Sequence, residues 1–517
     1  MAVRPFTCSS VSILGGAACA LGLLAGALPA EAATLSAAAA ADLEIEPYIE
    51  GLAGPTDVAV LPDGRVVAIE RTGNVYTKPL GDGELLEDRI DVLSNRAEQG
   101  LLGVVADPDF ASNQYLYFYA SAGESEGSRH QVHRYKLGAD GKLSDMKVVV
   151  AMGLRGPDNH NGGALDIYQG NLYIGVGDTG ANSSPPTNKF SSCLNIANGK
   201  VLRVSLAEAT LGQPADDNPL VAEAMVTSCD SPREAFGLAA PEKRVFAWGF
   251  RNPFRLWVDR TTGLVWVGDV GEQSREEVSV ISKGDHAGYP FWEGTKEWKQ
   301  DFVPPNGGCM GMAPATACVA PIVDWARGSG GSAIGGRILD GCGWPAAWKS
   351  RYIFGDHEQG KVWTIDVNAA RNAMVEGSQK DFASTTEIRS LRMGTDNALY
   401  LVEGSGTVSR VTAKNTTTTP GSCKAVDGGD SGVGGNGAGG DAGTSPGGSD
   451  GVAGTLSGGS PSAGSAGSSA AGGGGNGSSS DGGCGCQVVG GASTSLAGLG
   501  ALAAALGLAL RRRRRAA

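Results

Sequence analysis

The sequence of 517 residues predicts an all-β fold, a six-bladed β-propeller over residues 43–413. Two observations indicate it. The region has no long helical pattern and is rich in short β-branched and aromatic runs separated by Gly, Asp and Pro, as in strands and tight turns. A phrase made of an Asp, Asn or Gly turn and a strand of alternating apolar residues also recurs six times, at residues 61–70, 112–120, 168–178, 260–270, 355–366 and 395–404.

The spacing of these phrases favours blades with long loops. A propeller blade buries its faces only against neighbouring blades, so hairpins repeated along the chain indicate radial repetition. Six phrases in residues 43–413 give roughly 62 residues per blade, and a minimal four-stranded blade needs fewer. The remaining residues are expected in loops, where function usually lies. A β-sandwich is the alternative, but it would not require six such repeats.

The segment before the propeller, residues 1–33, predicts a cleaved export signal. A short positive start with Arg4 is followed by an uncharged apolar run, Val11 to Leu28, and by small residues at Ala30, Ala32 and Ala33. This order is the one that a signal peptide requires. An N-terminal membrane anchor is the alternative.

Residues 414–483, after the propeller, predict a disordered linker. The stretch 421–480 contains 23 Gly and 13 Ser, the composition of a flexible coil, and the last aromatic residue of the chain is Tyr400. Aromatic side chains contribute the largest buried areas, so this stretch is not expected to form a core of its own.

The last segment, residues 484–517, predicts a transmembrane helix. Val488 to Leu510 carry no charge and are long enough to cross a bilayer, and Arg511 to Arg515 place the end of the chain in the cytoplasm. With the Cys484-Gly485-Cys486 motif before it, this tail resembles the C-terminal sorting signals of myxobacterial surface proteins, in which the span is removed. An ordinary tail anchor is the alternative, and in both cases we expect the propeller at the cell surface or outer membrane.

The net charge and the cysteines limit the possible partners and predict disulfides. Lys and Arg number 42 and Asp and Glu 54; because five arginines form the terminal run, residues 1–510 carry 37 − 54 = −17. Nucleic acid is therefore a poor partner. Six cysteines of the exported part predict disulfides, and the pairing of neighbours Cys309 and Cys318 is the one that we expect; the six are Cys193, Cys229, Cys309, Cys318, Cys342 and Cys423.

Five ordered motifs give the region a family resemblance. They are Gln99-Gly100-Leu101-Leu102-Gly103, Asp107-Pro108-Asp109-Phe110, His160-Asn161-Gly162-Gly163, Gly249-Phe250-Arg251-Asn252-Pro253, and Gly268-Asp269-Val270-Gly271 with Glu276-Glu277-Val278. In this order they resemble the soluble quinoprotein glucose/sorbosone dehydrogenases. The resemblance covers most of residues 43–413 and implies a six-bladed propeller, which agrees with the repeat count.

The resemblance also implies a reaction. Oxidising a sugar hydroxyl needs a base for the proton and a cofactor for the hydride, which no side chain can accept. The family uses pyrroloquinoline quinone, polarised by calcium, and passes electrons to an external acceptor. By this resemblance His160 is the base, a role that suits imidazole, Asp178 orients its ring, and Gln99 lies near the sugar.

The implied cofactor pocket matches the family only in part. Arg251, Asn252 and Arg389 correspond to residues that bind the quinone, and the backbone carbonyls of Gly271 and Glu272 to the calcium ligands. Three positions depart from the family pattern: Glu387 replaces an arginine, Glu358 a lysine and Asn159 an acid. Two added carboxylates would repel a tricarboxylate, so we expect quinone binding only if a cation such as Arg327 or Arg337 compensates.

Three functions follow from these residues. The first is a cell-surface quinoprotein that oxidises aldose sugars, with Gln99, His160, Asp178, Arg251, Asn252 and Arg389 converging at one mouth of the propeller. The second is a propeller without catalysis that binds carbohydrate or protein, as in relatives of the hedgehog-interacting protein. The third is a lactone hydrolase, which would need a central metal site lined by acids such as Asp178 and Asp269.

Overall fold

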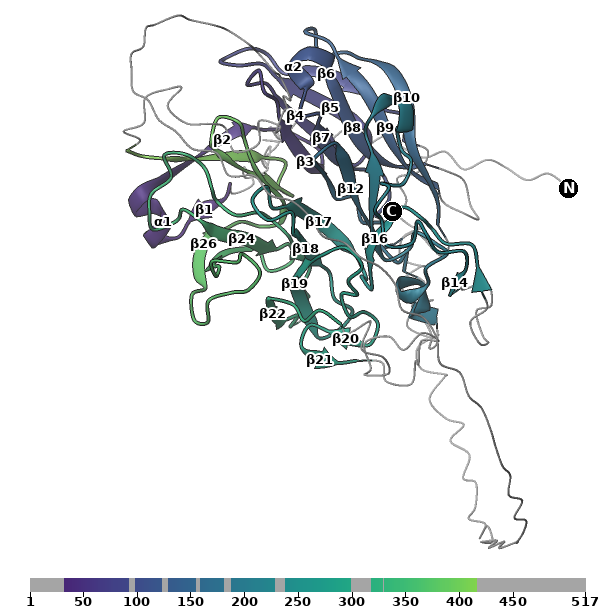
Figure 1. Cartoon of the computed structure of the whole chain (residues 1–517). Helices are drawn as coiled ribbons and strands as arrows, with labels where there is room; N and C mark the ends of the chain where they lie inside the picture. The colour runs from purple at the N-terminus through teal and green to yellow at the C-terminus, as the bar shows by residue number, and fades with distance from the viewer. Residues whose placement is uncertain are drawn as a thin grey trace, which may run out of the picture. The chain divides into compact units, whose positions relative to one another are not determined.

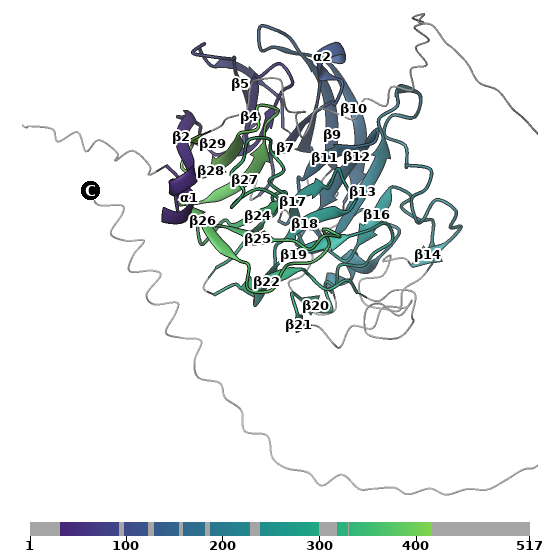
Figure 2. The same ribbon diagram turned by 60° about the vertical axis from the view of Figure 1, so that its left-hand side comes forward.

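The computed structural model describes residues 32–92, 98–122, 129–154, 159–180, 187–227, 238–298, 318–328 and 330–415. In this part of the chain, six antiparallel sheets stand around a central axis (Figure 1 and Figure 2). The six-bladed, all-β propeller is thereby confirmed.

Each blade begins with its innermost strand. The strands of the first three blades are β3 (Pro55–Val60), β4 (Val66–Glu70), β5 (Asn74–Lys78) and β6 (Leu86–Arg89); β7 (Leu101–Ala106), β8 (Tyr115–Ala122), β9 (Arg129–Leu137) and β10 (Leu143–Gly153); and β11 (Leu165–Tyr168), β12 (Asn171–Val176), β13 (Lys200–Ser205) and β16 (Val245–Trp248).

The last three blades close the ring. Their strands are β17 (Pro253–Val258), β18 (Val265–Asp269), β19 (Arg275–Ile281) and β22 (Val323–Ala326); β23 (Ala333–Ile334), β24 (Arg351–Asp356), β25 (Lys361–Asp366), β26 (Lys380–Ser384) and β1 (Thr34–Leu35); and β27 (Ile388–Met393), β28 (Leu399–Glu403), β29 (Val408–Ala413) and β2 (Leu43–Ile49). Short elements fill the loops: β14 (Val226–Thr227), β15 (Leu238–Ala239), β20 (Trp292–Glu293), β21 (Lys296–Glu297), α1 (Ala37–Asp42), α2 (Phe110–Asn113), η1 (Thr187–Ser192) and η2 (Glu208–Thr210).

The N-terminal strand completes the sixth blade. β2 pairs with β29, so the start and the end of the propeller share one sheet. The structure also corrects the predicted start at residue 43. β1 pairs with β26, and α1, capped by the Ser36 hydroxyl at Ala39 N (3.1 Å), buries Ala39 against the fifth blade. The fifth blade therefore has five strands instead of the four that we expected.

All six repeated phrases lie in β-hairpins, as predicted. Five of them join the first and second strands of a blade, whereas residues 355–366 join β24 and β25, the second and third strands. The turn residues explain the phrase, because several have left-handed backbone conformations that glycine and asparagine tolerate. Gly64 (φ 85°) and Asn397 (φ 63°) are two of them.

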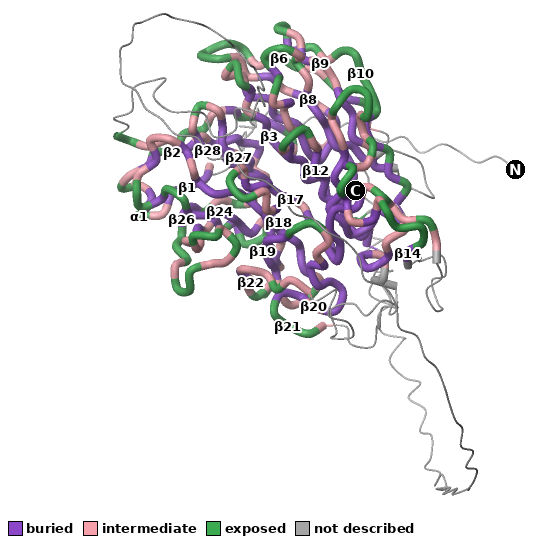
Figure 3. The backbone as a smooth tube through the Cα atoms, viewed as in Figure 1, coloured by how far each residue is buried: buried purple, intermediate pink, exposed green. Residues whose placement is uncertain are grey.

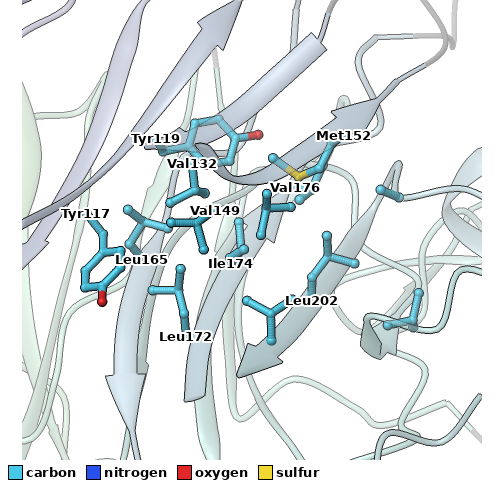
Figure 4. Packing of buried hydrophobic residues seen from close by; sticks show 14 of the residues in the cluster. Tyr117, Tyr119, Val132, Val149, Met152, Leu165, Leu172, Ile174, Val176 and Leu202 are labelled. Carbon is cyan, nitrogen blue, oxygen red and sulfur yellow. The ribbon is translucent and has the colours of Figure 1, made fainter. Parts of the chain in front are cut away.

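The core lies between blades. Figure 3 shows the strands buried along the middle of the molecule, with exposed residues mainly in outer turns. At the contact of the second and third blades, Tyr117, Val132 and Val149 pack against residues of the next blade (Figure 4). Leu165 and Ile174 on that side are fully buried. A blade alone would leave this surface in water, so neighbouring blades stabilise each other.

Blade architecture sorts the loops to two ends of the axis. The loops that enter each innermost strand and those that leave each second strand lie together at one end, which we call the entry face. The turns between first and second strands lie at the other end, which we call the exit face. Distant segments such as 159–164, 177–180 and 249–252 thus become neighbours.

Several sequence predictions fall outside the described residues. Residues 1–31 and 416–517 hold the signal, nearly all of the linker and the span, so these stay predictions. In the described part, no helix combines the length and apolar character needed to cross a bilayer. Cys193, Cys318 and Cys342 are disulfide-bonded. The pairing of Cys309 with Cys318 stays a prediction, because Cys309 is not described.

Candidate functional site

A histidine and a carboxylate form the centre of the entry face. His160 lies in the loop that enters β11, and Asp178 in the loop that leaves β12. His160 Nδ1 lies 2.6 Å from Asp178 Oδ1, and the two residues are 8% and 0% exposed. The left-handed backbone of His160 (φ 50°) turns its carbonyl toward Thr179 N, 3.2 Å away. The fold therefore holds the ring in one orientation.

An arginine of the next blade contacts the other ring nitrogen. NH2 of Arg251, in the loop that enters β17, lies 2.8 Å from His160 Nε2. A guanidinium can only donate, so Nε2 accepts and the ring proton resides on Nδ1, where Asp178 accepts it. The histidine is thus held as the tautomer whose Nε2 lone pair faces the site. NH1 of Arg251 donates to the Val270 carbonyl at 3.0 Å.

Asn252 fixes the loops instead of projecting from them. Its side-chain oxygen accepts the Gly162 N–H at 2.9 Å, two residues after His160. Its own N–H and that of Arg251 donate to the carboxylate of Asp269, at 2.6 and 2.9 Å. The motif around Arg251 is therefore tied both to the histidine loop and to the end of β18.

Three buried carboxyl groups lie behind this loop. Burial raises the pKa of Asp269, with a smaller contribution from the Asp178 charge. Burial also raises the pKa of Glu277, its cross-strand partner, and the Asp269 charge adds to that effect. Burial also raises the pKa of Glu276 to about 8, although the nearby Arg327 favours its charged form. Such displaced pKa values are typical of functional sites. From the sequence, Asp269 was expected only as a metal ligand and Glu276 and Glu277 had no expected role. Both adjacent glutamates are buried, and nothing in the local sequence indicates this.

The remaining predicted catalytic residue, Gln99, adjoins the histidine. It is 2% exposed in the loop that enters β7. The carboxylate of its neighbour Glu98 accepts the His160 N–H at 2.7 Å. The structure therefore brings His160, Asp178, Arg251 and Asn252 into one hydrogen-bonded group, with Gln99 beside it.

Arg389 reaches the same face but is already paired. At the start of β27 it donates to Glu387 (2.8 Å) and to the Pro55 carbonyl (3.1 Å). Glu387, which replaces a family cation, thus neutralises a predicted cofactor ligand two residues away. The other departures, Glu358 and Asn159, are exposed.

One of the two predicted calcium ligands is already engaged by a cation of the protein. The Gly271 carbonyl accepts a hydrogen bond from Arg327 NH1. The Glu272 carboxylate accepts from Tyr289 and from Trp298, each at 3.1 Å. Among the described residues, no group of three or more His, Cys, Asp or Glu could hold a metal ion.

The donors at the entry face suit an anionic, oxygen-rich cofactor better than a metal. Besides NH1 and NH2, Arg251 has a buried Nε, a donor that finds no hydrogen-bond partner in the described part of the chain. Of the two arginines named as possible compensating cations, Arg327 lies at this face and contacts Glu276. Arg337 lies at the exit face with its guanidinium over Trp257 (5.2 Å).

The exit face holds a cavity of about 760 Å³. Five of the innermost strands line it, together with the residues that follow β23 in the fifth blade. Ion pairs between blades surround it, such as Arg260 with Asp166 (2.7 Å) and Arg134 with Glu208 (2.7 Å). Toward the middle of the axis, Arg392 pairs with the fully buried Asp57 at 2.7 Å. Arg255, 2% exposed, donates to the Thr56 and Arg389 carbonyls beside this pair.

Known proteins resemble the chain over this whole region. The family model described as Glucose / Sorbosone dehydrogenase matches residues 52–410. An uncharacterized protein of Synechocystis sp. is 28% identical over 305 residues, 55% of this chain and 66% of the relative. Quinoprotein glucose dehydrogenase B of Acinetobacter calcoaceticus is 24% identical over 260 residues, 46% of this chain and 50% of that protein. These matches span about two thirds and one half of the relatives' own lengths.

Solved structures share the fold. The apo form of the soluble aldose sugar dehydrogenase of Escherichia coli superposes with a TM-score of 0.55 at 22% identity, covering 72% of this chain and 99% of that one. The PQQ-bound aldose sugar dehydrogenase of Streptomyces coelicolor gives 0.52 at 19% identity, with 72% and 98% covered.

Proposed function

Because the chain belongs to the glucose/sorbosone dehydrogenase family, we propose that it oxidises an aldose sugar with pyrroloquinoline quinone bound at the entry face. The observation that carries the proposal is the buried pair of His160 and Asp178, 2.6 Å apart, whose ring presents Nε2 as an acceptor. A sugar dehydrogenase needs such a base within reach of a hydroxyl group of the sugar.

The residues of the entry face would act on the hydroxyl proton. A sugar hydroxyl takes the place of Arg251 NH2 at His160 Nε2 and gives its proton to that nitrogen. Asp178, at Nδ1, stabilises the imidazolium that results, because a buried carboxylate interacts strongly with a nearby positive charge. The quinone, when bound, supplies the acceptor for the hydride.

Arg251 is the proposed contact of the quinone, and Asn252 positions the loop that carries it. A guanidinium presents paired donors to a carboxylate, and Arg251 already lies beside the base. Arg389 contributes less than the family pattern implies, since Glu387 neutralises it. The buried position of His160 excludes water from the proton that it accepts.

Binding without catalysis is the second candidate. It is favoured by the paired state of Arg389 and by the hydrogen bonds that Arg251 already makes within the protein. In that case the entry face would hold a carbohydrate or a protein, and no redox chemistry would occur.

Location and electron transfer are proposed from the sequence. The predicted signal and C-terminal span support an exported propeller held at the cell surface or outer membrane. The electrons of the sugar would then pass to an acceptor outside the cell membrane.

Reconstitution of the purified apo protein tests both candidates. We expect the quinone absorption spectrum to shift on binding and aldoses to reduce an added dye. His160→Ala should keep the spectral shift and lose sugar-dependent dye reduction. If the protein binds quinone and His160→Ala is as active as wild type, the assigned base is refuted. If wild type does not bind quinone and does not reduce the dye with any aldose, the non-catalytic candidate is supported.

A further inference from the structure

The loop that the resemblance assigns to calcium already holds a cation of the protein. Arg327 NH1 donates to the Gly271 carbonyl and, at 2.9 Å, to Glu276 Oε1. Glu276 is 0% exposed and the Arg327 side chain 23%. The backbone N–H of Arg327 also donates to the Ser274 carbonyl in the same loop, at 3.0 Å. Arg327 is thus held both through its backbone and through its guanidinium.

The preceding carbonyl is taken by a second guanidinium. Val270 O accepts from Arg251 NH1 at 3.0 Å, so two successive carbonyls of this loop each face an arginine. A divalent cation bound to these carbonyls would lie close to both guanidinium groups, and in a partly buried site their positive charges would repel it strongly. Calcium would have to displace one of these groups before it could reach either oxygen.

Two side-chain carboxylates of the loop also accept hydrogen bonds. Glu276 Oε2 accepts the N–H groups of Ala333 (2.7 Å) and Gly271 (3.2 Å). Glu272 Oε2 accepts from Tyr289 and Trp298. Calcium takes six to eight oxygen ligands, so a loop whose oxygens already accept hydrogen bonds is poorly suited to it.

We propose that Arg327 takes the place of calcium in this chain, and that the loop at Gly271 binds no calcium. The guanidinium supplies the positive charge of the site, and Glu276 positions it. The inference rests on the proposed function only for the anion that Arg327 would meet, a carboxylate-bearing cofactor. The claim about calcium concerns cation binding alone.

Terbium luminescence of the purified full chain tests the proposal. Terbium ions occupy calcium sites, and Trp298, hydrogen-bonded to Glu272, would sensitise an ion bound in this loop. We expect wild type to show no luminescence that calcium displaces. Arg327→Gln should gain it, with half-saturation at least about tenfold below any residual binding of wild type. Arg327→Lys, which keeps the charge, should behave like wild type.

A matched control separates charge removal in general from this position. Arg275→Gln removes a nearby arginine that pairs with Asp324 (2.7 Å) and not with Gly271, so it should gain no site. Calcium-displaceable luminescence in wild type that Arg327→Gln leaves unchanged would overturn the proposal. Should Arg327→Gln fail to fold, wild type decides: absence of such luminescence supports the proposal, and its presence refutes it. Failure of sugar oxidation would leave this result unaffected.

Discussion

The two ends of the propeller axis differ in how their charged groups are placed. At the entry face, Asp178 and Glu276 are fully buried and bind His160, Arg327 and backbone N–H groups. At the exit face, ion pairs join neighbouring blades, and Glu208 is 64% exposed. The cavity of about 760 Å³ belongs to the second end. The carboxyl groups whose pKa burial raises, Asp269, Glu276 and Glu277, lie behind the entry face and favour it as the candidate site.

Removing the carboxylate behind the histidine should have the largest effect. In Asp178→Asn the amide cannot stabilise an imidazolium, so we expect kcat to fall on the order of 10²–10⁴-fold. Steady-state dye reduction with a saturating aldose measures it. Tyr168→Phe, in the exit cavity, is the control and should stay within about twofold of wild type. A similar loss of kcat in both variants would contradict the assignment of catalysis to the entry face.

The ion pair of Arg392 with Asp57, between the two ends of the axis, should affect stability and not activity. Arg392→Ala leaves Asp57 buried and short of its partner, which we expect to cost about 3–5 kcal/mol of unfolding free energy. Urea denaturation followed by tryptophan fluorescence measures this loss. A change below about 1 kcal/mol would show that the pair behaves like an exposed one.

The Asp57 carboxylate should also make the free energy of unfolding depend on pH. Burial opposes ionisation of Asp57, but Arg392 and Arg255 outweigh it and lower its pKa to about 2. Because the folded pKa lies below the unfolded value of about 3.9, the stabilisation is complete above pH ~4 and is lost as the pH falls toward 2, by about 2–3 kcal/mol. Arg392→Ala should flatten this part of the pH profile. An equal slope in wild type and variant would assign the acid sensitivity to other groups.

The smallest effect is expected at the exit face. Glu208 pairs with Arg134 and Lys147 but is largely exposed, so solvent screens both pairs. Glu208→Ala should therefore change unfolding free energy by only about 0–1 kcal/mol and leave kcat unaffected. A loss comparable to that of Arg392→Ala would contradict the contrast between buried and exposed pairs.

The sequence predicted the fold better than the site, for physical reasons. Six turn-and-strand phrases were visible because turn chemistry and strand periodicity are local. The strand at Thr34–Leu35 was missed, since its pairing partner β26 lies about 350 residues later and two residues carry no periodicity. The ion pair of Arg389 with Glu387 could have been predicted from the sequence, because residues two positions apart in an extended chain point to the same face.

The contact of Arg327 with Gly271 could not be derived in the same way. The two residues are 56 positions apart, and the segment between them holds the third and fourth strands of the blade. Only the closing of the blade brings the arginine back to the loop. His160 and Asp178 could be named because they lie in conspicuous motifs, but their contact with Arg251 depends on how two blades meet.

A crystal structure of the protein soaked with pyrroloquinoline quinone and glucose tests the central claim most directly. We expect quinone density at the entry face beside Arg251 and a sugar hydroxyl within hydrogen-bonding distance of His160 Nε2, with the exit cavity holding solvent. Quinone or sugar bound in the exit cavity, among Trp257 and Arg337, with none at His160, would contradict it.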